Sequence, residues 1–135
     1  DDGPADDARS GGEGERAGDL SVRRGRVAYL RCDGVEHAGG PFPCPRDEAL
    51  EAAVWSIVDG LAACAGAPSA PGRGDVRLDY RGDAAPAIDW RDTFADDVVR
   101  LDAARVLGCL REELAGTRQS LGARRLLVSF RFALE

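Results

Sequence analysis

Apolar residues recur every three or four positions over 50–64, which predicts a helix with one buried face. That face would hold Leu50, Val54, Ile57, Val58, Leu61 and Cys64. Asp47 is a favourable N-cap for this helix, and Gly66 and Pro68 end the pattern. The same spacing over 96–114 predicts a second helix. Its stripe would hold Val99, Ala103, Val106, Leu110 and Leu114.

Strict alternation of apolar and polar residues predicts the strands. Residues 76–80 alternate in this way, Gly82-Asp83 then makes a turn, and a short strand follows over 88–90, so this stretch is typical of a hairpin. The most regular strand lies at the end of the chain, over 126–134. If it lay at a sheet edge, it could accept an added strand from another protein.

The region before the first helix carries a weaker signal. Val27, Ala28, Tyr29 and Leu30 predict a short strand that runs into Cys32. The stretch over 33–45 holds three glycines and three prolines and is expected to be a loop. All elements together predict an α+β domain over 21–135. Its two helices would pack on one face of a small, mostly antiparallel sheet of three or four strands.

Four cysteines allow three disulfide pairings. Cys32 and Cys44 flank the Gly/Pro-rich loop, and closing it would stabilise the fold by about 3 kcal/mol in the chain-entropy model. Cys64 and Cys109 lie at the apolar edges of the two predicted helices. We therefore predict the disulfides Cys32–Cys44 and Cys64–Cys109. Disulfides indicate an oxidising compartment, which would be periplasmic, outer-membrane-associated or extracellular.

A rival interpretation gives the Cys32–Cys44 loop a metal or small ligand to carry. His37 lies between the two cysteines, so the three residues could form part of a metal site or a nucleophile and base. The loop lacks the Cys-x-x-Cys spacing of structural zinc sites and shows no fourth ligand. We expect no metal and no cofactor.

Charge is concentrated at the start of the chain. Residues 1–20 hold seven acidic side chains against two arginines, a net −5 of the total −6. This segment is rich in glycine and has Leu20 as its only large apolar residue, so it is predicted to be a disordered acidic leader or tether. The first residue is not Met, and one hypothesis is a lipoprotein with its lipid anchor upstream of Asp1.

Composition also bears on function. The net negative charge and the absence of lysine argue against nucleic-acid binding, and there is no apolar run long enough for a transmembrane helix. The single histidine counts against a small hydrolase, and we assign no catalytic residue. Arg-Gly-Asp occurs at 73–75 and 81–83, where turn chemistry explains it better than adhesion.

Large aromatic residues are the remaining candidates for a partner surface. Such residues are enriched in interface hot spots, although core packing is their default role. The candidates are Trp55, Trp90, Phe130 and Phe132.

The order helix, strand, turn, strand, helix, strand accompanies two helix-borne cysteines, in Leu61-Ala62-Ala63-Cys64 and Leu107-Gly108-Cys109-Leu110. Gly74–Asp83 follows the first helix as a strand and turn, and Leu127–Phe132 closes the pattern. Over 47–134 the chain thus resembles the TonB C-terminal-like domain, in particular the two-cysteine type of AgmX/PglI envelope proteins. The Tyr-Pro pair of energy-transducing TonB proteins is absent.

The resemblance implies a non-catalytic cell-envelope module of bacterial origin that binds other envelope proteins and needs no cofactor. This is the function we expect, through strand or groove contacts.

Overall fold

The computed structural model describes residues 20–35 and 44–135. The predicted leader, apart from Leu20, lies outside the described residues. So do His37 and most of the Gly/Pro-rich loop.

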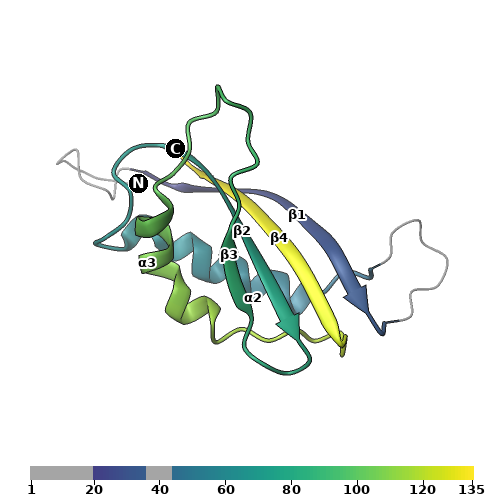
Figure 1. Cartoon of the computed structure of the whole chain (residues 1–135). Coiled ribbons are helices and arrows are strands. Elements are labelled where there is room, and N and C mark those ends of the chain that lie inside the picture. The colour runs from purple at the N-terminus through teal and green to yellow at the C-terminus, as the bar shows by residue number, and fades with distance from the viewer. Residues whose placement is uncertain (1–19, 36–43) are drawn as a thin grey trace.

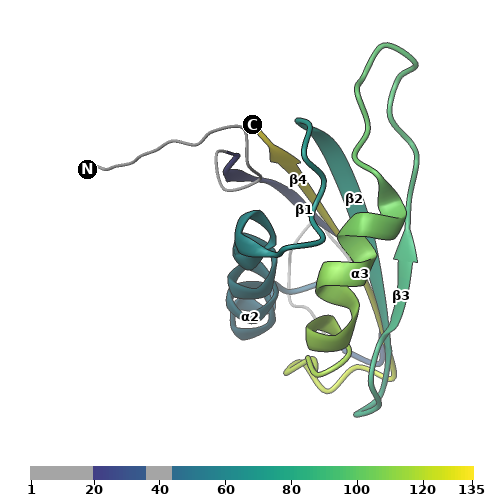
Figure 2. The ribbon, with the colours of Figure 1, turned by 90° about the vertical axis from the view of Figure 1, so that its left-hand side faces the viewer.

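Two helices pack on one face of a four-stranded antiparallel sheet with the strand order β1-β4-β2-β3 (Figures 1 and 2). The elements in chain order are β1 (Val22–Asp33), α2 (Glu48–Asp59), a short 3-10 helix η2 (Gly60–Ala63), β2 (Gly72–Arg81), β3 (Ala87–Trp90), α3 (Ala103–Leu114) and β4 (Arg125–Leu134). The predicted fold class is confirmed. The opposite face of the sheet carries no helix of the described chain (Figure 2).

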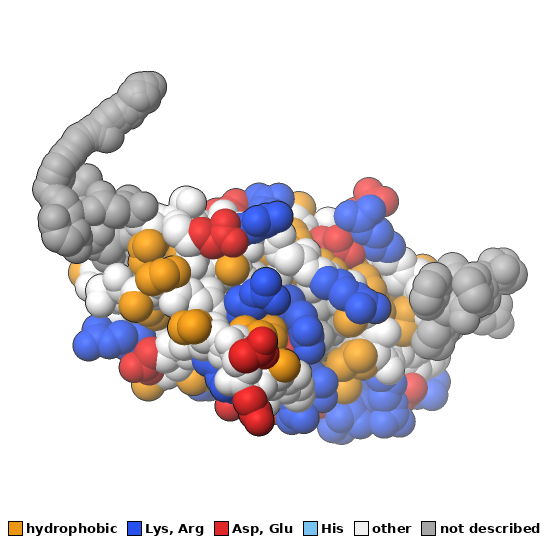
Figure 3. Space-filling model, turned by 90° about the horizontal axis from the view of Figure 1, so that it is seen from above, with side chains coloured by type: hydrophobic (Ala, Val, Ile, Leu, Met, Phe, Trp, Pro, Cys, Tyr) orange, Lys and Arg blue, Asp and Glu red, His pale blue; other side chains and the backbone are white. Residues whose placement is uncertain are grey.

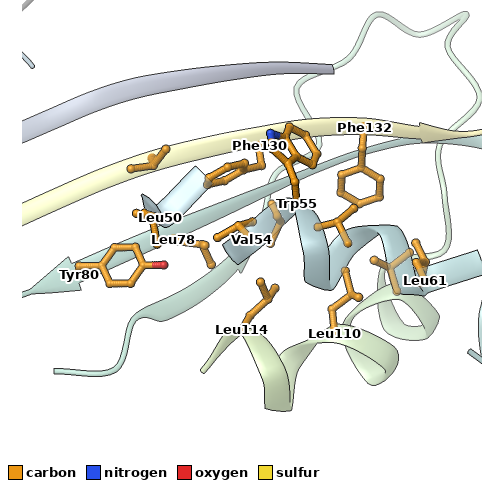
Figure 4. Packing of buried hydrophobic residues seen from close by; sticks show 14 of the residues in the cluster. Leu50, Val54, Trp55, Leu61, Leu78, Tyr80, Leu110, Leu114, Phe130 and Phe132 are labelled. Atoms are coloured by element: carbon orange, nitrogen blue, oxygen red, sulfur yellow. The ribbon is translucent and has the colours of Figure 1, made fainter. Parts of the chain in front are cut away.

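The core lies between the helices and the sheet (Figure 4). β4 contributes Phe130 and Phe132, and both rings are buried. The Trp55 ring of α2 stands edge-on to that of Phe130, with the centroids 5.4 Å apart. Leu110 and Leu114 of α3 complete the layer. Trp55 is 6% exposed although it lies beside the main apolar stripe of its helix, because β4 passes directly over it.

Asp47 caps α2 as predicted and also ties it to a distant loop. Its carboxylate accepts the Leu50 amide over 3.1 Å, which satisfies one of the free donors at the helix start. The same carboxylate accepts the amide of Ser120 over 2.7 Å and the Ser120 hydroxyl. This second set of bonds explains why an N-cap aspartate is only 1% exposed.

The second helix is shorter than predicted, since α3 begins at Ala103 and not near 96. Asp102 is its N-cap and accepts the amides of Ala104 and Arg105. Just before it, the backbone around Arg100 pairs with β2, through bonds of 2.9 Å from the Arg73 amide to Val99 and from Leu101 to Arg73. This pairing uses backbone groups that a helix would need.

The final strand, β4, lies inside the sheet between β1 and β2 and therefore cannot accept an added strand. Within residues 20–35 and 44–135, β1 and β3 form the two free edges of the sheet. β1 is also longer than the predicted segment 27–30, because it pairs with β4 from Val22 to Asp33.

Both predicted disulfides are confirmed. Cys32–Cys44 joins β1 to the segment before α2, and Cys64–Cys109 joins the end of η2 to α3, with a Cα–Cα distance of 6.1 Å in the latter. Two disulfides in a small chain indicate an oxidising, extracytoplasmic compartment. Neither helix in the described ranges has the length and apolar run needed to cross a bilayer.

Candidate functional site

The four aromatic residues considered for an interface form two edge-to-face pairs. Trp55 packs on Phe130, and Trp90 packs on Phe132 at 6.3 Å between centroids. Three of the four rings are buried in the core, and only Trp90 is partly exposed. The structure therefore does not gather these residues on one surface.

The outer edge of β1 is the most extended unpaired feature of the described sheet. Ser21 and Glu135 exchange two backbone hydrogen bonds of 2.9 and 3.0 Å at the start of the β1–β4 ladder. Hydrogen-bonded and non-hydrogen-bonded pairs alternate in an antiparallel ladder. Val22 and Arg24 therefore direct their amide and carbonyl groups away from β4, toward the open edge.

A groove of about 640 Å³ runs beside this edge. One wall is β1 over 26–30, and the other comes from Cys44, Arg46 and Glu51 near the start of α2. The Cys32–Cys44 disulfide and the hydrogen bond from the Asp47 amide to the Tyr29 hydroxyl fix the second wall relative to the first. The groove is thus built on regular elements and not on free loops, and its size suits an extended segment or small ligand.

A partly buried polar network holds the base of the groove. The Tyr29 hydroxyl donates to Glu51 Oε2 over 2.5 Å and accepts the Asp47 amide over 2.8 Å. Arg46 donates from Nε and Nη2 to the same carboxylate at 3.0–3.1 Å. Burial, and then the hydrogen bond to Glu51, raise the pKa of Tyr29 well above its ordinary value. The Tyr29 hydroxyl and both Glu51 carboxylate oxygens are engaged, so the network is a support for the groove and offers no free acid or base.

The free edge also carries features that discourage indiscriminate pairing. β1 has register irregularities between Arg24 and Val27 and between Tyr29 and Arg31. It also carries four arginines, at positions 23, 24, 26 and 31. Bulges and charged side chains are the usual protection of an exposed edge strand. An added strand would have to accommodate the irregular register and this positive charge.

The disulfide between Cys32 and Cys44 does not fit the interpretation of this loop as a metal site or a nucleophile. Cys32 and Cys44 are bonded to each other, so neither offers a thiolate to a metal or a substrate. Within the described ranges, no group of three or more His, Cys, Asp or Glu residues is arranged to hold a metal ion. His37 lies outside those ranges.

The Arg-Gly-Asp sequence at 73–75 belongs to β2. The side chain of Asp75 is 3% exposed and accepts the Ser129 hydroxyl over 2.5 Å and Arg131 Nε over 3.1 Å. A carboxylate held in this way cannot reach a receptor. The second copy, 81–83, forms the turn after β2, with Gly82 at φ +56°.

Sequence reasoning missed the edge of β1 because the two irregularities interrupt its alternation. The density of arginine over 23–31 was the available signal, since charge is characteristic of an edge strand.

Comparisons of the chain with protein-family models, with curated proteins and with solved structures give no match.

Proposed function

We propose that this chain is a non-catalytic interaction module of the cell envelope or its surroundings, which takes up an extended segment of another envelope protein along β1. The observation that carries the proposal is the free edge of β1, with a rigid groove beside it. In strand addition, backbone hydrogen bonds supply affinity, and the neighbouring pockets select side chains.

Three further points support the proposal. The disulfides suit an extracytoplasmic setting. The groove walls are joined by one of these disulfides and by the Tyr29–Glu51 network, so little ordering would be needed on binding. The order of elements over 47–134, which resembles the TonB C-terminal-like domain, is a third line of support.

The test begins with a displayed library of random twelve-residue peptides, selected against the full chain. A peptide that adds to β1 should slow exchange of the Val22 and Arg24 amides, which face the open edge. The amide of Arg23 serves as the control, because it faces β4 in the free protein.

N-methylation of the selected peptide provides the matched comparison. In an added strand, the backbone amides of every second residue point toward the edge of the sheet and donate hydrogen bonds to it. Methylating one alternate set of amides should therefore abolish binding, while methylating the other set should leave it nearly unchanged. Equal effects of the two sets, or protection away from β1, would contradict strand addition.

A further inference from the structure

The uncovered face of the sheet carries a trough lined with arginine. Two adjoining hollows of about 340 and 260 Å³ share Arg26 and Arg131 and so form one continuous depression across β1, β4 and β2. The charged residues that line it are Arg23, Arg26, Arg73, Arg77 and Arg131, against Asp75 and Glu135. Arg24 also borders it, but its guanidinium pairs with Asp59 of α2 over 2.6 Å. Figure 3, which looks down on the molecule from above the view of Figure 1, shows arginine side chains interspersed with hydrophobic and acidic ones.

The acidic residues of the trough neutralise little of this charge toward solvent. Asp75 is engaged below the surface by Ser129 and Arg131. Among the described residues, Glu135 makes an ion pair with Arg23 alone, over 3.5 Å, and both side chains are more than half exposed, so this pair is weak. The trough therefore presents more positive charge than its own acids can balance.

Arg26 and Arg73 are the arginines most available to a ligand. Neither makes an ion pair with another residue in 20–35 or 44–135. They stand on β1 and β2, on the two sides of β4, so one ligand lying across the trough could meet both. The Nε of Arg77 is buried and has no hydrogen-bond partner in the described chain. Because buried donors are normally paired, a ligand in the trough could supply the acceptor that this group lacks.

Apolar surface lies between these charges. The Phe94 ring sits in the trough with the Arg131 guanidinium 5.0 Å from its centroid, and Ala133 lies beside it. Ala28 and Leu30 line the other hollow, and Leu30 is 44% exposed. Arginine guanidinium groups bind carboxylates through paired hydrogen bonds, and the apolar patches between them can contact apolar side chains. A segment in which acidic and apolar residues are interspersed would therefore fit this surface.

We propose that this trough binds an acidic segment of a partner protein, with Arg26 and Arg73 as its main charged contacts. The trough lies on the face of the sheet, so the proposal goes beyond the binding of a strand at the β1 edge. A peptide is favoured over a polyphosphate chain because the depression combines charge with apolar patches, which a polyphosphate has no side chains to cover.

The test measures fluorescence anisotropy of a labelled, end-capped peptide, Glu-Glu-Glu-Leu-Glu-Glu-Glu, with the full chain at low and physiological salt. Arg26→Gln and Arg73→Gln should each weaken binding about threefold, and the double variant about tenfold or more, with weaker binding at the higher salt. Arg111→Gln on the exposed side of α3 removes the same charge and should leave affinity within about twofold. Circular dichroism of each variant verifies that it is folded.

Three outcomes would overturn the proposal. The first is equal binding by the double variant and the native chain. The second is a twelve-nucleotide single-stranded DNA that binds as tightly as the peptide with the same arginine dependence, which would make the trough a general polyanion surface. The third is a gain of about tenfold or more when the acids of residues 1–19 are replaced by their amides, because the occupant would then be this chain itself.

The Arg73→Gln variant distinguishes failure of the trough proposal from failure of strand addition at the β1 edge. Arg73 lies on β2, away from the edge groove, so Arg73→Gln should not change the affinity of a peptide that protects the β1 amides.

Discussion

Asp75 and Arg131 stand directly opposite each other on β2 and β4, and Arg131 Nε donates to the Asp75 carboxylate over 3.1 Å. The carboxylate is almost fully covered, while the guanidinium reaches Thr93 and the Phe94 ring in the trough. Directly opposite residues project to the same face of a sheet, so this ion pair lies on the uncovered face, with its carboxylate buried and its guanidinium partly exposed.

Replacing Asp75 should destabilise the fold. Asp75→Asn removes the charge that Ser129 and Arg131 satisfy, and we expect a loss of about 2 kcal/mol in the free energy of unfolding. Asp89→Asn is the control, because Asp89 is 61% exposed and pairs with Arg91 at the surface, so its loss should stay below about 0.5 kcal/mol. Urea denaturation measures both, and equal losses would contradict the assigned role.

The two disulfides should contribute unequally. Cys64–Cys109 spans 45 residues and Cys32–Cys44 spans 12, so the chain-entropy model gives about 4 and 3 kcal/mol respectively. Paired Cys→Ala variants, unfolded in urea without reductant, would measure each contribution. A larger loss from the shorter loop would show that native contacts, and not loop entropy, dominate the difference.

The two tyrosines should resist ionisation in the folded protein. Burial raises the pKa of Tyr80 to about 12, and burial with the Glu51 hydrogen bond raises that of Tyr29. The unfolded chain loses these protons near pH 10, before the folded one does. Stability is therefore expected to fall as the pH rises from about 10 toward 12.

The chain contains only these two tyrosines, so tyrosinate absorbance near 295 nm reports both directly. At pH 10.5 the native protein should show little signal, and addition of denaturant should release it. Tyr80→Phe should flatten the alkaline loss of stability, and a native signal at pH 10 would contradict the burial of the hydroxyls.

Acid should weaken the ion pair between β2 and β4 at the other end of the sheet. Arg125 donates to both Asp79 oxygens at 3.0–3.1 Å, and this bond holds the pKa of Asp79 below its usual value. The stabilisation is present above the unfolded pKa near 4 and is lost as the pH falls through the lower folded value. Arg125→Gln should therefore cost about 1 kcal/mol at pH 7 and much less at pH 2. A cost independent of pH would assign the effect to packing.

Two glycines should respond in opposite directions to alanine. A Cβ at Gly74 in β2 would lie 2.6 Å from the Trp90 ring and 2.9 Å from the Phe132 ring, so Gly74→Ala should cost about 1–3 kcal/mol. Gly108 in α3 has open space around it, and Gly108→Ala should stabilise by about 0.5–1 kcal/mol through helix propensity. Thermal unfolding distinguishes them, and a neutral Gly74→Ala would show that the two rings move apart at little cost.

Local sequence patterns were sufficient for the elements whose residues alternate regularly. The stripe of α2, its Asp47 cap and the alternation of β4 are short-range features, so they predicted the helices-on-sheet fold. The pairing of Cys64 with Cys109 followed because both residues lie at the apolar edges of the two predicted helical stripes, and in the structure Cys64 directly follows η2 while Cys109 lies in α3.

The candidate sites depend on contacts between distant segments, which periodicity does not contain. Strand order decides that β4 is internal and β1 is an edge, and the pairing of β2 with the segment 99–101 decides where α3 begins. The trough likewise exists only because β1, β4 and β2 bring separate arginines to one face. By itself, the sequence determined the elements, the fold class and the disulfides, because local spacing sets which residues share a face. Only the tertiary structure decided which edge and which face stay open, because long-range backbone pairing sets the order of the strands.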